Sequence, residues 1–252
     1  MAGHSQFKNI MHRKGRVDAK RAKIFTKLGR EIQVAAKAGG GDPSANPRLR
    51  NAIIAARAEN MPNDRIKKSI DAGTGAGNTE NYEEIRYEGY AVGGVAVIVE
   101  ALTDNKNRTA PYVRSCFSKY GGNLGETGSV GFMFDHLGVI TYGAAVAAAD
   151  AVFEAALEAG AENVDSTDEH HEITTLPEGF IAARDALEEK FGPAEKAELT
   201  WRPNVMSMVD AATAHSILKM VEALEDSDDV QNVITNFEVS EEDLQKLANE
   251  QS

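Results

Sequence analysis

The clearest indication of fold class comes from residues 138–205, which read GVITYGAAVAAADAVFEAALEAGAENVDSTDEHHEITTLPEGFIAARDALEEKFGPAEKAELTWRPNV. Segments that alternate apolar and polar residues, as strands do, flank segments whose apolar residues recur at helical spacing. The pattern predicts strands at 139–142, 161–166, 171–175 and 197–205, with helices at 144–159 and 177–191. That order, β-α-β-β-α-β, is typical of a ferredoxin-like unit.

The sequence on either side of this unit predicts a second α/β domain that the unit interrupts. The earlier part predicts strands at 83–90 and 94–103, a helix at 105–120 and a strand around 130–134. The later part predicts a helix at 211–225, a strand at 230–238 and a final helix at 240–249. Because the later part is too small to bury a core alone, we expect residues 79–137 plus 206–252 to form one discontinuous domain, with residues 138–205 inserted.

The N-terminal region predicts a small helical bundle. Helices are expected from about 18 to 37, from 46 to about 60, and after Met61-Pro62-Asn63, and the Gly-rich residues 72–78 are expected to be a linker. Residues 1–16 hold too few apolar side chains to bury, so we expect a mobile basic arm. The fold class is therefore α+β: an N-terminal three-helix bundle (17–78 with its linker) followed by two α/β domains, the last ferredoxin-like and inserted into the middle one.

Charge is distributed unevenly along the 252 residues, although the net charge is −12. Residues 1–72 hold 16 Lys+Arg against 6 Asp+Glu, whereas the remainder holds 11 against 33. The basic part indicates an anionic polymer as partner, and the acidic part suits protein contacts or repulsion from off-target phosphates. No apolar run approaches the roughly 18–20 residues that cross a bilayer, which excludes a membrane protein. The single cysteine, Cys116, fits a reducing cytoplasm.

The first predicted helix concentrates its positive charge on one face. At about 100° per residue, Lys20, Lys23, Lys27 and Arg30 lie on one side of the helix. If the helix extends backwards, Arg13 and Arg16 join them, and the six cations share an arc about 100° wide. The arc contains no acidic residue, so its charges repel unless an external anion such as phosphate neutralises them. An ordinary solvated face is the alternative. The candidate nucleic-acid-binding residues are Lys8, His12, Arg13, Lys14, Arg16, Lys20, Lys23, Lys27 and Arg30.

A second candidate binding segment is the polar run Thr103–Thr109, TDNKNRT. Asp and Asn cap helices naturally, so the run is expected to begin the helix at 105–120. Its density of Asn, Arg and Thr exceeds what capping needs. Asn105, Asn107, Arg108 and Thr109 are therefore a secondary candidate binding loop, with capping alone as the alternative.

Signals for catalysis or metal binding are weak. The run Asp168–Glu172, DEHHE, resembles a ligand set, but adjacent strand residues point to opposite faces, which favours an acidic turn. The chain shows no nucleophile–base pair and no paired carboxylates with a reason to be paired. We therefore predict no enzyme, no metal, no cofactor and no small-molecule substrate.

Long, gap-free motifs give the chain a family resemblance. They are GHSQFKNIMHRKGRVDAKRAKIFTKLGREIQVAAKAGG, NPRLRNAI, NMPNDRIKKSI, YEEIRYEGYAVGGVAVIVE, LTDNKNRT and GGNLGETGSVGFMF. Together they closely resemble the YebC/PmpR family, densely from Gly3 to about Phe134 and in pattern beyond it. The chain departs at Gln6-Phe7, where Lys-Trp is common, and at Ala91-Val92, where Gly-Pro is frequent.

This resemblance implies a function as well as a three-domain architecture. Family members are described as DNA-binding transcriptional regulators, and a related branch, including a mitochondrial translational activator, works on the ribosome. It therefore implies a cytoplasmic regulator that binds DNA, or alternatively a translation factor that binds ribosomal RNA with the same surface. Protein partners through the acidic α/β domains are also expected.

Overall fold

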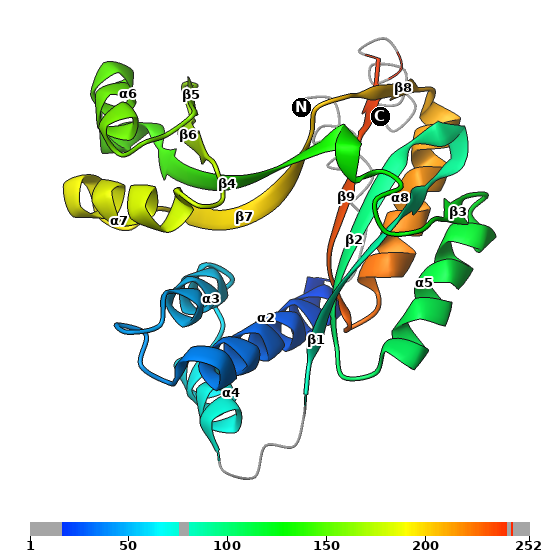
Figure 1. Cartoon of the computed structure of the whole chain (residues 1–252), viewed down its shortest axis with the longest axis horizontal. Helices are drawn as coiled ribbons and strands as arrows, with labels where there is room; N and C mark the ends of the chain where they lie inside the picture. Colours follow the sequence, from blue (N-terminus) through cyan, green and yellow to red (C-terminus); the bar gives the residue numbers. More distant parts are fainter. Residues whose placement is uncertain (1–16, 76–80, 241–242, 244–252) are drawn as a thin grey trace. The chain divides into compact units, whose positions relative to one another are not determined.

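A computed structural model describes residues 17–75, 81–240 and 243 (Figure 1). The chain divides into two compact units, each built from distant segments. The first contains α2 (Val17–Gly39) up to Arg30, Thr79–Phe134 and the chain from Pro203; the second contains Glu31–Asn78 and Asp135–Arg202. The predicted α+β class is confirmed, with a helical N-terminal region followed by α/β domains.

The first unit is built on an antiparallel sheet with the strand order β3-β1-β2-β9. Its strands are β1 (Glu83–Tyr90), β2 (Ala96–Thr103), β3 (Asn123–Leu124) and β9 (Val230–Thr235). Helices α5 (Lys106–Lys119) and α8 (Ala211–Glu225) pack on one sheet face around a core that includes Val97, Phe117 and Ile217. The sheet thus joins segments from before and after the ferredoxin-like unit.

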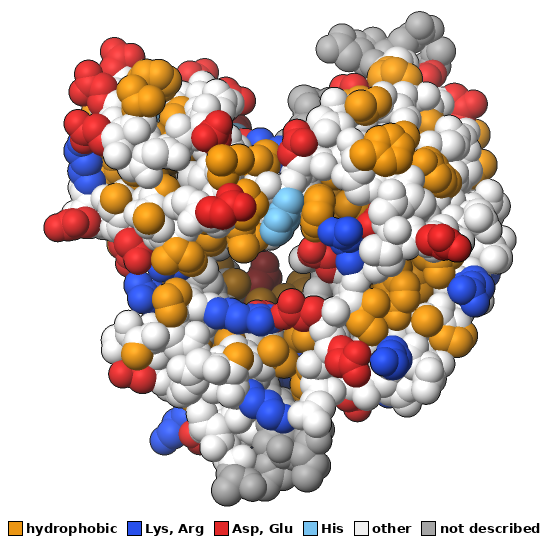
Figure 2. Space-filling model, viewed as in Figure 1, with side chains coloured by type: hydrophobic (Ala, Val, Ile, Leu, Met, Phe, Trp, Pro, Cys, Tyr) orange, Lys and Arg blue, Asp and Glu red, His pale blue; other side chains and the backbone are white. Residues whose placement is uncertain are grey.

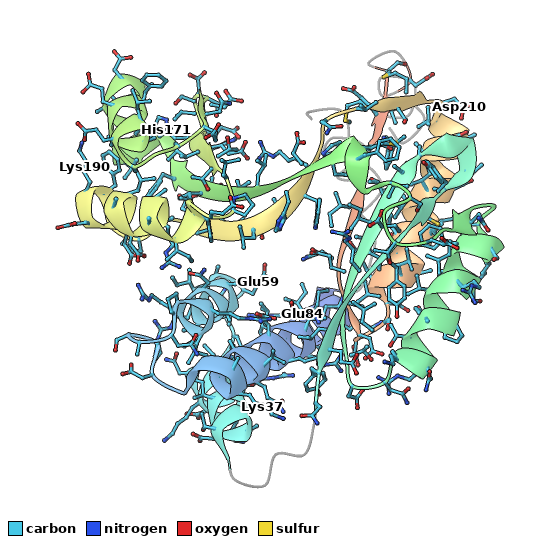
Figure 3. All side chains as sticks on the ribbon, viewed as in Figure 1. Lys37, Glu59, Glu84, His171, Lys190 and Asp210 are labelled. Atoms are coloured by element: carbon cyan, nitrogen blue, oxygen red, sulfur yellow. The ribbon has the colours of Figure 1, made fainter. Side chains whose placement is uncertain are left out.

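Local sequence signals set the ends of these elements. Strands β1 and β2 turn through Gly93 and Gly94, whose φ values of 78° and 73° favour glycine. Asp210, labelled in Figure 3, caps α8 because its carboxylate accepts a hydrogen bond of 2.7 Å from the Thr213 N–H. The predicted bounds of α8 and β1 match the structure for this reason.

Two predicted strands of this unit are wrong. Residues 130–134 do not form one strand: Gly131–Met133 is a 3₁₀ turn, whose start is held by hydrogen bonds of 2.9 and 2.8 Å from the N–H groups of Val130 and Gly131 to the buried Glu88 carboxylate. The strand at 230–238 is two strands, β9 and β10 (Phe237–Val239), and β10 pairs in parallel with the unpredicted β8 (Ser207–Val209). The final helix at 240–249 lies almost entirely outside the described residues.

The helical part of the second unit consists of the end of α2, α3 (Pro47–Ala58) and α4 (Asn63–Thr74). The buried Asn46 caps α3 through the Leu49 N–H and donates 2.8 Å to the Ala35 carbonyl of α2. Gly73 lies buried inside α4, so the predicted linker starts later than residue 72. A Cβ at Gly73 would approach the Gln33 carbonyl oxygen to 2.4 Å, which explains why α4 needs glycine there.

The remainder of the second unit is the ferredoxin-like fold. Its elements are β4 (Phe134–Gly143), α6 (Ala149–Glu158), β5 (Asn163–Ser166), β6 (His170–Thr175), α7 (Phe180–Phe191) and β7 (Lys196–Pro203). The sheet order is β5-β6-β4-β7, so β6 lies between the two strands that α6 connects, as in a split β-α-β unit. Side chains of α6 and α7 share a buried core with Ile140 and Ile173 of the sheet.

Candidate nucleic-acid interface

The candidate residues fall into two groups by position. Lys8, His12, Arg13, Lys14 and Arg16 lie outside the described residues, and Lys20 lies in α2 without a described side chain. Lys23, Lys27 and Arg30 follow one another at i, i+4 and i+7 on the part of α2 that belongs to the first unit. The structure brings these three cations together at the C-terminal end of α8.

Lys23 and Lys27 satisfy the exposed carbonyl groups where α8 ends. The Lys23 ammonium lies 2.5 Å from Asp226 Oδ1 and donates 3.1 Å to the Asp226 carbonyl. Lys27 donates 2.9 Å to the Glu225 carbonyl. A helix C-terminus leaves its last carbonyls without helical partners and carries a partial negative charge, so it attracts cations. Burial lowers the pKa of Lys27, and the carboxylates of Glu225 and Asp228 oppose that effect.

The Arg30 side chain is more deeply buried than that of Lys23. Its guanidinium donates 2.9 Å to the Leu102 carbonyl and 2.8 Å to the Asp228 carbonyl, and lies 2.9 Å from Asp229 Oδ1. It also stacks 5.0 Å from the Tyr82 ring centroid. The Arg30 side chain is 14% exposed and that of Asp229 is 6% exposed, against 39% and 72% for Lys23 and Asp226. Arg30 therefore anchors α2, whereas the Lys23 pair faces water.

These contacts correct the reasoning drawn from the sequence. The absence of acids within the arc of α2 predicts that phosphate relieves the charge repulsion. For Lys23, Lys27 and Arg30 that reasoning is wrong, because the carboxylates and carbonyls of residues 225–229 supply the compensation. These partners are about 200 residues away in sequence, so no local pattern could reveal them. Phosphate binding by the arc stays a prediction.

The secondary candidate loop meets the same acidic turn. Arg108 Nη2 lies 2.8 Å from Asp229 Oδ2, and the buried Thr109 hydroxyl donates 2.8 Å to the same oxygen. Asn105 caps α5 by accepting 3.2 Å from the Arg108 N–H, while Asn107 is exposed. Burial would raise the pKa of Asp229, but hydrogen bonds from Arg108, Thr109 and Arg30 outweigh it and hold that pKa below its usual value. Asn105, Arg108 and Thr109 thus have structural partners.

Sequence reasoning did not single out three further cations of the helical region. Arg57, Lys67 and Lys68 are exposed, and their side chains make no hydrogen bond or ion pair with any residue in the described part of the chain. On α4 the two lysines share their face with Asp64 and Asp71, which gives the mixed charge of an ordinary helix surface. We therefore leave them outside the candidate interface, where they serve as matched controls.

The acidic run Asp168–Glu172 begins as a turn at 168–169 and continues into β6, where His171, labelled in Figure 3, is buried. His171 Nδ1 lies 2.8 Å from the Ser166 hydroxyl and Nε2 lies 3.1 Å from the Ala147 carbonyl, so both ring nitrogens have protein partners. Across residues 17–75, 81–240 and 243, no group of three His, Cys, Asp or Glu side chains could hold a metal ion. Nor does that part of the chain contain a helix long and apolar enough to span a membrane.

The fold and this site define a class: a multidomain α+β protein in which a basic helix begins the first unit and docks on an acidic turn. Residues 5–76 match the model of the TACO1/YebC N-terminal domain, and residues 82–237 match that of the second and third domains. The chain belongs to the TACO1/YebC family, as the sequence motifs predicted. It is also similar to a conserved hypothetical protein from Aquifex aeolicus of known crystal structure, with 47% identity, a TM-score of 0.78, and coverage of 92% of this chain and 96% of that one.

Proposed function

We propose that this protein is a non-enzymatic, cytoplasmic regulator of gene expression that grips the phosphate backbone of nucleic acid through its basic N-terminal region. A DNA-binding transcriptional regulator is the form that we put first. The observation that carries the proposal is the charge segregation, with 16 Lys+Arg against 6 Asp+Glu in residues 1–72 of a chain whose net charge is −12. Family membership supports it, because the family is commonly called transcriptional regulator-like.

The contacts of α2 indicate which cations can take part. An exposed ion pair such as Lys23–Asp226 contributes roughly 0–1 kcal/mol, so a phosphate can displace the carboxylate at little cost. The buried Arg30–Asp229 pair cannot be opened so cheaply. In our proposal Lys23 exchanges its partner for phosphate alongside Lys20 and the basic residues before it, while Arg30 holds the helix in place.

A specific observation favours a second form, a translation factor that binds ribosomal RNA. Sequence-specific DNA readers present Asn, Gln and Arg to base edges from an exposed helix face. Asn51 of α3 accepts a 2.6 Å hydrogen bond from Arg184, and Asn46 is buried as the cap of α3, so neither amide is free to read bases, and Arg57 is the exposed base-reading side chain that α3 retains. A protein that contacts the phosphate backbone and the shape of a nucleic acid, without reading base edges, is suited to bind structured RNA.

Sedimentation of a cell lysate through a sucrose gradient separates the two forms. The transcriptional form predicts protein at the top of the gradient and a footprint on at least one promoter, bound about 10³-fold more tightly than unrelated duplex. The translational form predicts co-migration with ribosomal particles that survives DNase and is lost in Lys20→Gln/Lys23→Gln. Lys67→Gln/Lys68→Gln is the matched control, since it removes the same charge from α4. Protein at the top of the gradient with no footprint and no affinity for DNA or RNA would contradict both forms.

A further inference from the structure

Helix α6 of the ferredoxin-like unit exposes two large apolar side chains. Phe153 is 53% exposed and Leu157 is 65% exposed. They are four residues apart and therefore neighbours on one helix face. The other face of α6 supplies Val152, Ala155 and Ala156 to the buried core, so the exposed pair of Phe153 and Leu157 is not part of that core.

A row of acids runs beside this apolar pair. Asp150, Glu154 and Glu158 are exposed and recur at i, i+4 and i+8, adjacent to Phe153 and Leu157 on the helix surface. Like charges at this spacing repel. Figure 2 shows hydrophobic side chains among acidic ones over this part of the molecule.

The cations of α2 are neutralised by nearby carboxylates and carbonyls, whereas the acidic row of α6 has few neutralising partners. Lys190, labelled in Figure 3, lies 3.6 Å from Glu158, in a pair exposed to water on both sides. Asp150 lies in the first turn, where the helix dipole favours a negative charge. Glu154 has no ion pair with any cation in the described ranges. The acidic row therefore retains unneutralised charge beside an exposed apolar row.

The charge of the ferredoxin-like part of the second unit limits which kind of partner can bind to α6. Residues 135–202 hold 4 Lys+Arg against 15 Asp+Glu. Such a unit repels nucleic acid and anionic lipid, and it also repels a second copy of itself. An apolar row edged by acids complements a helix whose own apolar row is edged by Lys or Arg.

We propose that the α6 face formed by Phe153, Leu157, Asp150 and Glu154 is a docking surface for a basic amphipathic helix of a partner protein. The apolar pair anchors the partner helix, and the acidic row sets its orientation and increases its rate of association. The proposal is independent of the nucleic-acid site, since it uses a different unit and the opposite charge.

The test uses the full chain and a defined probe. The probe is a fluorescently labelled 18-residue peptide of Leu and Lys that forms one apolar and one basic helix face. A peptide of the same composition in scrambled order, without a continuous apolar face, is its control. Fluorescence anisotropy should show that the amphipathic peptide binds at least about tenfold more tightly than the scrambled peptide. Phe153→Ser/Leu157→Ser should weaken its binding by a similar factor, and the positions are exposed, so an unchanged melting curve is expected.

Charge variants complete the test. Asp150→Asn/Glu154→Gln should weaken binding and reduce its salt dependence, whereas Glu162→Gln/Glu169→Gln, which removes two exposed charges elsewhere in the unit, should leave it nearly unchanged. Equal loss in the two charge variants, or no loss in Phe153→Ser/Leu157→Ser, would overturn the proposal, since binding would then reflect net charge. Sedimentation equilibrium that shows a dimer abolished by Phe153→Ser/Leu157→Ser would also overturn it, because the face would then join two copies.

Discussion

The Asp229 carboxylate is the acceptor of several side-chain hydrogen bonds in the first unit. It accepts hydrogen bonds from Arg30 and Arg108 and from the hydroxyls of Thr103 and Thr109, in a side chain that is 6% exposed. A buried charge is tolerated only when it is paired and fully hydrogen-bonded. Asp229 meets that condition, so it ties α2 and the start of α5 to the turn after α8.

Replacing Asp229 should therefore be costly. Asp229→Asn keeps the side-chain size but leaves the buried Arg30 without its counter-charge, and we expect the free energy of unfolding to fall by about 3 kcal/mol. Urea denaturation of the full chain measures it. Asp228→Asn is the control, because its exposed side chain should contribute less than about 0.5 kcal/mol. Equal effects of the two changes would show that Asp229 is not the anchor.

The same carboxylate should make stability depend on pH. The pKa of Asp229 lies below its ordinary value of 3.8 in the folded protein. A group with a lowered folded pKa binds fewer protons folded than unfolded, so its contribution is complete above the unfolded pKa and is lost as pH falls through the folded one. We expect the unfolding free energy of the wild type to decrease below about pH 4, and to decrease less steeply in Asp229→Asn. Parallel pH profiles for the two proteins would contradict this assignment.

At the scale of elements, α4 depends on close approach to α2 at Gly73. A methyl group there would lie 2.4 Å from the Gln33 carbonyl oxygen and 2.9 Å from the Ala36 methyl group. The Gln33 carbonyl belongs to the backbone of α2 and cannot move aside without distorting that helix. We therefore expect Gly73→Ala to destabilise the protein by about 1–3 kcal/mol, although alanine has the better helix propensity. Thermal denaturation provides the measurement, with the exposed Lys68→Ala as control. A stabilised Gly73→Ala would mean that the two helices do not pack as described.

The elements also show what sequence can and cannot predict. Helix α8 and strand β1 were predictable because their caps, turns and periodicities are local. The 3₁₀ turn at Gly131–Met133 was not, because the Glu88 carboxylate that holds it is 42 residues away in sequence. The break between β9 and β10 was missed because Asn236 accepts from the distant Ala96 N–H through its side chain. The acidic turn opposite the cations of α2 could not be predicted for the same reason, because its residues are about 200 positions away in sequence.

At the scale of the whole molecule, the proposed function implies that internal carboxylates and external phosphates compete for the same cations. Asp226→Asn removes the carboxylate partner of Lys23 and one negative charge. We therefore expect nucleic acid to bind about threefold more tightly at low salt, which corresponds to the free energy of one exposed ion pair. Glu126→Gln, an exposed charge elsewhere in the first unit, is the control. Electrophoretic titration with a labelled duplex and with a structured RNA provides the affinities. Unchanged affinity in Asp226→Asn would remove Lys23 from the interface and leave the rest of the proposal intact.

The dependence of affinity on salt tests the central claim most directly. The cations that we expect to reach phosphates are Lys8, Arg13, Lys14, Arg16, Lys20 and Lys23. Lys27 and Arg30 are left out because Lys27 donates to the Glu225 carbonyl and Arg30 is paired with the buried Asp229. At about −0.9 per phosphate, a plot of log K against log salt for a 30-base-pair duplex should have a slope near −5, and Lys20→Gln/Lys23→Gln should reduce it by about 2. Lys67→Gln/Lys68→Gln should leave the slope unchanged. A slope shallower than about −2 in the wild type, or equal slopes in all three proteins, would contradict phosphate binding by the basic N-terminal region.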